Sequence, residues 1–166
     1  FPVPILILRA GPVTLLLRAA SPRWRARALA VLQSRAVGVV THPLLAWILL
    51  VAVMWGTHLS ILFDAALEDP LVHDLEHLLY LGTALLFWAP IFSVDPIRHR
   101  LRGAAALLYL IAQMPQNSFL GVAIMFSSAP LYPHYATLGR TWGPTPLEDQ
   151  QLAGALMWLV GEALFL

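Results

Sequence analysis

The 166 residues are 59% hydrophobic and only 11% charged, and their mean hydropathy is +0.73. This composition excludes an ordinary water-soluble domain and is typical of a polytopic membrane protein. All ten basic residues are arginine and the net charge is +1, so the overall charge indicates no nucleic-acid partner. Because the chain has no cysteine, metal chemistry would depend on histidine and methionine.

Five apolar segments predict an all-α fold, a polytopic transmembrane helix bundle with about five spans. The first segment is weakened by Arg9, Gly11 and Pro12. No internal repeat or linker is visible, so residues 1–166 are expected to form a single transmembrane domain. The chain begins with Phe and ends inside an apolar run, which indicates a fragment of a longer protein. The segments are residues 1–17, 44–63, 71–92, 101–126 and 151–166.

The four connections between these segments differ in charge. Residues 18–41 carry five arginines and no acid, whereas residues 64–70 carry three acids and no base. Residues 93–100 are basic again, and residues 127–150 hold one arginine and two acids. Since basic connections stay in the cytoplasm, the first and third connections are predicted inside and the other two outside.

The basic connection at residues 18–41 contains a candidate surface helix. Ser21 and Pro22 form a helix start, and arginines and leucines fall on different sides of residues 21–34. This pattern predicts a short amphipathic helix on the cytoplasmic surface, in contact with the lipid bilayer. The arginines could bind anionic lipid, or they could belong to an ordinary basic retention loop.

Residues 71–92 combine a membrane-spanning length with four ionisable side chains in the first two turns. A helix places His73, Glu76 and His77 on one face, with the two imidazoles one turn apart. This face is a candidate edge of a metal site, where Glu76 would either orient an imidazole or be an interfacial carboxylate. Alternatively, the histidines snorkel to the membrane interface or hydrogen-bond a neighbouring helix.

The soft donor side chains gather in the outer half of the predicted membrane, within roughly 15 Å of its outer surface at a rise of about 1.5 Å per residue. Neutral imidazole and thioether groups suit Cu(I), whereas a site without cysteine and with few carboxylates suits magnesium, calcium or structural zinc poorly. The methionines could equally be packing residues. The predicted copper ligands are His58, His73, His77, Met54 and Met157.

Two further polar residues lie inside apolar segments. Asn117 clusters with glutamines around a kink at Pro115, and polar groups at this depth need internal partners. Glu162 would lie near the middle of the membrane. It could relay protons or form a hydrogen bond to a neighbouring helix.

Several strings in the chain resemble the multi-span CtaG-type assembly factors of bacterial cytochrome c oxidase, the group associated with caa-type oxidases. The strings are THPLLAW, HLSILFDAAL, LVHDLEHLLYLGTALLFWAPIFSVDP, MPQNSFLGVAI and LGRTWGPTPLEDQQLAGALMWLVGE. The similarity runs through nearly the whole chain from Leu15 onward. The positions of this chain that match the family pattern are His58, His73, Glu76, His77, Asp149, Gln150, Met157, Trp158 and Glu162.

This resemblance implies a multi-pass protein of the bacterial plasma membrane that is needed to make active oxidase. The implied partners are oxidase subunits, and the implied role is copper delivery by a larger protein of roughly seven spans. Family members usually carry an HMxxH-like motif before the point where this chain begins, and that motif is absent here. Many members have a histidine where Asn117 stands, so this chain departs from the family pattern there and a metal ligand at this position is not expected.

Two other functions stay open at this point. One is a membrane electron carrier that binds haem through His58 and either His73 or His77, because the last two share a helix face and cannot clamp one haem. The other is a structural partner of the oxidase that binds no metal. Enzyme activity is not expected, since the chain shows no pairing of nucleophile and base and no phosphate-binding glycine loop.

Overall fold

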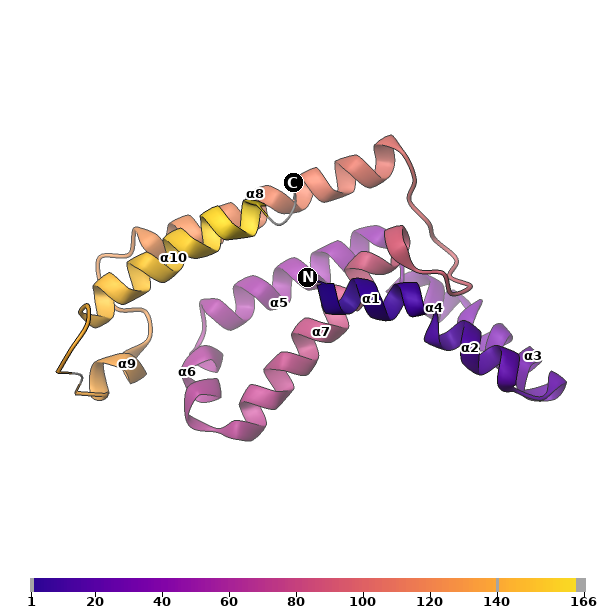
Figure 1. Cartoon of the computed structure of the whole chain (residues 1–166), viewed down its shortest axis with the longest axis horizontal. Coiled ribbons are helices and arrows are strands. Elements are labelled where there is room, and N and C mark those ends of the chain that lie inside the picture. Colours follow the sequence, from indigo (N-terminus) through magenta and orange to yellow (C-terminus); the bar gives the residue numbers. More distant parts are fainter. Residues whose placement is uncertain (1, 140, 164–166) are drawn as a thin grey trace. The chain divides into compact units, whose positions relative to one another are not determined.

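The computed structural model describes residues 2–139 and 141–163, apart from the side chain of Glu162. Every regular element within these residues is a helix, as Figure 1 shows, so the predicted all-α fold is confirmed. In chain order the helices are α1 (Pro2–Ala10), α2 (Pro12–Ala19), α3 (Pro22–Leu32), α4 (Arg35–Val40), α5 (Pro43–His58), α6 (Ile61–Glu68), α7 (Pro70–Phe92), α8 (Ala104–Met125), α9 (Pro133–Thr137) and α10 (Pro146–Ala163).

Three helical stretches are long and apolar enough to cross a membrane: Pro2–Ala19, which combines α1 and α2, together with α7 and α8. Helices α5 and α6 add a fourth if the bent pair is counted as one span. The fifth predicted segment is helical as α10, which has 18 residues like Pro2–Ala19, but it is too polar to be counted with the other three stretches. The first turns of α10 hold Glu148, Asp149 and two glutamines, which lower its hydropathy. The structure supports three to four of the five predicted spans.

The first apolar stretch is broken at Gly11. This residue has φ 63° and ψ 53°, the left-handed conformation that glycine adopts without a steric penalty. Pro12 then occupies the first turn of α2, where its missing N–H costs no hydrogen bond. The interruption expected from the sequence is therefore a boundary between two short helices, which together still form one apolar stretch, Pro2–Ala19.

The second apolar stretch bends by 70° between α5 and α6. At the end of α5, the hydroxyl of Thr57 and Nδ1 of His58 both donate to the carbonyl oxygen of Met54, at 3.4 and 2.9 Å. Ser60 then starts α6, because its hydroxyl accepts a hydrogen bond from the Leu62 N–H at 3.2 Å. The predicted apolar segment over residues 44–63 therefore consists of two helices that meet at a bend.

The chain divides into two compact units that are described separately. Unit 1 comprises Phe1–Val53 and Leu78–Ala106, and unit 2 comprises Met54–His77 and Leu107–Leu166. Helices α5 and α7 contribute one end to each unit. The copper ligands predicted from the sequence all belong to unit 2.

In unit 2, α8 and α10 pack with their backbones in close approach (Figure 1). An ideal Cβ on Gly154 would lie 2.6 Å from the Met125 nitrogen and 2.7 Å from the Gly121 carbonyl oxygen. Such contact requires small residues at the crossing, as is usual between membrane helices. Further along, Nδ2 of Asn117 donates to the carbonyl oxygen of Met157 at 3.0 Å. These contacts fix the position of Met157 relative to α8.

Candidate functional site

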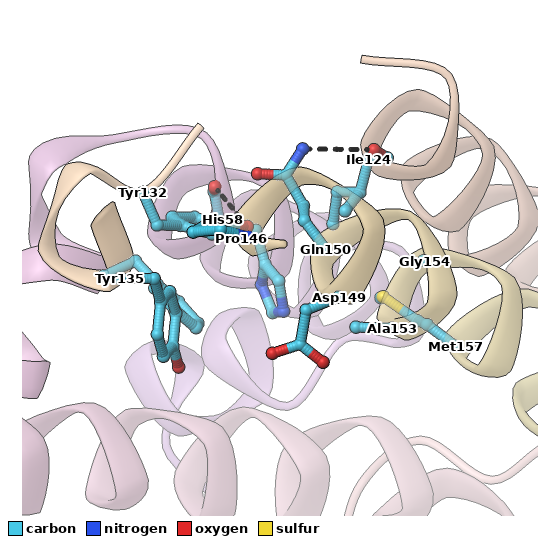
Figure 2. Close-up of a pocket in the computed structure, with 11 residues that line it drawn as sticks. His58, Ile124, Tyr132, Tyr135, Pro146, Asp149, Gln150, Ala153, Gly154 and Met157 are labelled. Carbon is cyan, nitrogen blue, oxygen red and sulfur yellow. Dashed lines mark hydrogen bonds between the residues drawn. The ribbon is translucent and has the colours of Figure 1, made fainter. Parts of the chain in front are cut away.

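Unit 2 contains a pocket of about 480 Å³ at the ends of α5 and α10. Its chemically distinctive lining residues are His58, Tyr132, Tyr135, Asp149, Gln150 and Met157. Figure 2 shows the ring of His58 and the carboxylate of Asp149 directed into the same space. Apolar groups, among them Phe63 and Ile124, form much of the remaining wall.

His58 is held at the end of α5 by its own backbone turn. Its Nδ1 lies 2.9 Å from the carbonyl oxygen of Met54, and a carbonyl can only accept, so Nδ1 is the donor. In the neutral ring the proton is then on Nδ1, and Nε2 is the nitrogen with ligand chemistry. The ring also packs against Phe63, with 5.7 Å between their centroids.

The start of α10 is fixed by a capping box formed by Thr145 and Glu148. The Thr145 N–H and hydroxyl each donate to Oε2 of Glu148 at 2.8 Å, and the Glu148 N–H donates back to the Thr145 hydroxyl at 3.3 Å. The hydrogen bond from the Thr145 backbone, followed by that from its hydroxyl, lowers the pKa of the Glu148 carboxyl. This start places Asp149 and Met157 two turns apart on one face of α10, toward the pocket.

Gln150 ties the neighbouring loop to α10. Its side chain is buried, with Oε1 accepting from the Leu131 N–H at 2.6 Å and Nε2 donating to the Ile124 carbonyl oxygen at 3.4 Å. The adjacent Tyr132 donates its hydroxyl hydrogen to the His58 carbonyl oxygen at 3.1 Å. Gln150 and Tyr132 thus connect the two walls of the pocket.

Helix α9 is attached to α6 by His134. The His134 N–H donates to Oδ1 of Asp64 at 3.4 Å, and Nδ1 of its ring lies 3.4 Å from Oε1 of Glu68. The neighbouring Tyr132 ring stacks on Phe63, with 4.2 Å between centroids. The second and fourth connections of the chain are therefore in contact with each other.

The structure brings together only some of the residues predicted as ligands. His58 and Met157 line the pocket together with Asp149, whereas Met54 is buried nearby and contributes its carbonyl oxygen to the site. Among the described residues, no group of three or more histidines and carboxylates has the geometry to hold a metal ion. The side chain of Glu162, predicted as a polar residue near mid-membrane, lies outside the described residues.

His73 and His77 lie elsewhere, on the exposed surface of the first turns of α7. Their ring centroids are 4.4 Å apart, as the one-turn spacing predicts, but neither residue lines the pocket. Oε1 of Glu76, which was predicted to orient an imidazole, is buried without a hydrogen-bond partner among the described residues. Asn117 serves a different purpose, because its amide holds the Met157 backbone.

The sequence prediction missed the two tyrosines of the pocket and the capping box. Tyr132 and Tyr135 lie in a connection where no periodicity indicates their contacts. The capping box could have been found, because Thr-Pro-Leu-Glu at residues 145–148 combines an N-cap threonine, a proline at the first helical position and a glutamate at the third.

The family model of the cytochrome c oxidase caa3 assembly factors matches residues 1–166, the full length of the chain. The chain belongs to this family. Membership confirms the resemblance seen in the sequence.

Similar proteins are found in mycobacteria. The uncharacterized protein Mb0105 of Mycobacterium bovis is 29% identical over 168 residues, which cover 96% of this chain and 25% of that protein. The uncharacterized protein ML1998 of Mycobacterium leprae is also 29% identical over 168 residues, covering 96% of this chain and 26% of that protein. The chain therefore spans about a quarter of the length of these relatives. No solved structure is significantly similar to it.

Proposed function

We propose that this member of the caa3 assembly factor family handles Cu(I) as cargo during assembly of cytochrome c oxidase in the bacterial plasma membrane. It acts on oxidase subunits as a binding and delivery partner and catalyses no reaction of its own. The observation that carries the proposal is the meeting of His58, Asp149 and Met157 around one pocket.

The donor set of the pocket fits this cargo. An imidazole and a thioether are ligands that Cu(I) accepts, and the Asp149 carboxylate adds a negative charge that favours any cation in a mostly apolar pocket. Two soft donors give a weaker site than three or four would. A weak site suits a protein that must release its metal to an acceptor.

His73 and His77 complete the proposal as a second, exposed pair of donors. Their rings lie one turn apart at the surface of α7, where a metal could be taken up or passed on without opening the pocket. The haem alternative gains no support from the pocket, because His58 is its one histidine among the described lining residues.

The finer topology is part of the same proposal. Residues 151–166 form the fifth crossing, and the pocket faces the outer side of the membrane, since the acidic connection at residues 64–70 lies beside it. Copper handling on this side is compatible with delivery to an oxidase subunit whose metal site is exposed there.

Anaerobic Cu(I) titration of the purified full-length protein against a competing chelator tests the pocket. His58→Ala should weaken binding at least about tenfold, and Met157→Leu should also weaken it, because each change removes one of the two soft donors. Met114→Leu is the matched control: it makes the same change on α8, away from the pocket, and should bind as the wild type does. The double variant His73→Ala/His77→Ala reports separately on the exposed pair.

A second experiment measures oxidase activity in cells under copper limitation. In each strain, one variant is the sole copy of the protein. Loss of activity with His58→Ala at normal membrane levels, with full activity for Met114→Leu, is the expected result. If His58→Ala binds Cu(I) with unchanged affinity and supports full oxidase activity, the pocket is not a copper site and the proposal fails.

A further inference from the structure

Unit 1 concentrates nearly all the positive charge of the protein. Nine of the ten arginines fall within it, and Asp95 is its one acidic residue. The carboxylate of Asp95 is buried and accepts a hydrogen bond from the Thr14 N–H at 2.6 Å, near the start of α2. Asp95 therefore binds the N-terminal turn of α2. No described carboxylate forms an ion pair with an arginine of unit 1.

The connection between α7 and α8 is held rigidly against α2 and α4. The Arg100 guanidinium donates to the carbonyl oxygens of Ser93 and Asp95, both at 2.6 Å. On the other side, the side chain of Arg98 lies against α4, where an ideal Cβ on Gly38 would be 3.0 Å from the Arg98 Cδ. These contacts fix the positions of Pro96, Ile97 and Arg98.

Three cavities meet at Pro96. The largest, about 540 Å³, is an apolar groove whose walls include Leu8 of α1, Leu32 of α3, and Leu79 and Gly82 of α7. The second, about 310 Å³, is lined by Gln33, Pro96, Ile97 and Arg98. The third, about 280 Å³, includes Arg18, Arg25 and Pro96. An apolar groove thus opens beside two arginine-lined pockets.

The arginines around Pro96 differ in whether their guanidinium groups are already bound by the protein. The guanidinium of Arg25 caps α2, because it donates to the carbonyl oxygens of Leu17, Arg18 and Ala20 at 2.8 to 3.3 Å. The guanidinium of Arg98 has no hydrogen-bond or ion-pair partner among the described residues, and the same holds for Arg18. Arg98 and Arg18 therefore present charge that the protein itself does not neutralise.

We infer that unit 1 holds a binding site for an anionic phospholipid. The apolar groove receives an acyl chain, and the headgroup phosphate lies between Arg98, with the Gln33 amide beside it, and Arg18. One wall of the groove belongs to α7, a helix long and apolar enough to span the membrane, so lipid reaches the groove directly from the bilayer. Basic pockets next to membrane helices are typical sites for anionic headgroups.

Other occupants fit these features less well. A free phosphate would use the arginine pockets but not the apolar groove, and an apolar helix would use the groove but not the unpartnered guanidinium groups. The groove volume lies in the range of small-ligand pockets, roughly 300 to 1,000 Å³. A phospholipid is the occupant that combines both chemistries in one molecule.

Native mass spectrometry of the full-length protein in detergent, titrated with phosphatidylglycerol or phosphatidylcholine, tests the headgroup. The wild type should bind phosphatidylglycerol more tightly, and Arg98→Gln should lower that affinity roughly fivefold, the effect of one arginine near an anionic surface. Arg102→Gln removes an equal charge from an exposed position outside the three cavities and is the matched control. Equal losses in both variants would mean diffuse attraction without a site and would overturn the inference.

The groove is tested with a pair of glycine variants. Gly82 lines the groove, and an ideal Cβ there meets no atom within 4 Å, so Gly82→Leu adds an apolar side chain at the groove wall and should reduce binding of both lipids. Gly56→Leu places the same side chain in open space on α5 and should have no effect. Unchanged lipid binding by Gly82→Leu would overturn the inference.

Competition with inorganic phosphate tests whether the site is specific for lipid. If phosphate fully displaced phosphatidylglycerol, the site would be a simple anion pocket and the inference would be overturned. His58→Ala should leave lipid binding intact, so this test is independent of the copper proposal.

Discussion

Thr145 and Glu148 fix the first turn of α10, and their hydrogen bonds depend on the charge of one carboxylate. Because the folded protein lowers the pKa of Glu148 below its ordinary value of 4.5, the ionised form is the one that stabilises the capping box. This contribution is complete above the ordinary pKa. It is lost as the pH falls through the lowered value.

We therefore predict a local loss of order at the start of α10 under acid conditions. Hydrogen exchange of the Thr145 amide, expressed as protection relative to its intrinsic rate, should be constant at neutral pH and decrease as Glu148 becomes protonated. Glu148→Gln should show lower protection at neutral pH and little dependence on pH. A parallel decrease in both proteins would contradict the assignment to the Glu148 carboxylate.

The residues of the pocket show how far sequence reasoning reaches. Chemical type and depth were sufficient to select His58 and Met157, and family resemblance added Asp149. The same reasoning also selected His73 and His77, which lie outside the pocket, because helical spacing shows which residues share a face but not which helix that face meets. The contacts that decide this, such as the Tyr132 hydroxyl on the His58 carbonyl oxygen, join residues 74 positions apart.

Among the elements, the long apolar helices were predictable and their bends were only partly so. Continuous hydropathy identified α7 and α8, and Gly11 with Pro12 indicated the break before α2. The bend after His58 was not predicted, since residues 44–63 are almost uniformly apolar and hydropathy does not register side chains that compete for a carbonyl oxygen. Close packing of α8 on α10 depends on glycines whose role becomes visible only when both helices are present.

This packing makes Gly154 sensitive to a single added methyl group. Gly154→Ala would bring Cβ to within 2.6 Å of the Met125 nitrogen, so the helices must separate, at a cost of about 1 to 3 kcal/mol for overpacking. The thermal denaturation midpoint of the full-length protein should decrease. Gly56→Ala should instead leave it unchanged or raise it, since alanine favours the helix by up to about 1 kcal/mol and Gly56 faces open space. Equal midpoints for the two variants would show that the close approach of α8 and α10 does not contribute to stability.

At the scale of the whole molecule, each unit contains two connections that are predicted to lie on the same side of the membrane. In unit 1 the first and third connections meet, because Arg98 lies against Gly38. In unit 2 the second and fourth connections meet, because His134 contacts Asp64 and Glu68. Alternating connections of a chain that crosses the membrane repeatedly must lie on the same side. The contacts within each unit therefore support the alternation that charge alone indicated.

The sidedness of this arrangement gives the last prediction. Unit 1 carries nine arginines and one acid, whereas the connection at residues 64–70 carries three acids and no base, so the positive-inside rule places the connections of unit 1 in the cytoplasm. Because the chain has no cysteine, a single cysteine can report on each side. In intact cells a membrane-impermeant maleimide should label Glu68→Cys and leave Arg23→Cys unlabelled until the cells are opened. Arg23 is preferred to Arg25, whose guanidinium caps α2. The opposite labelling pattern would place the His58 pocket on the cytoplasmic side, where copper would have to be supplied from within the cell.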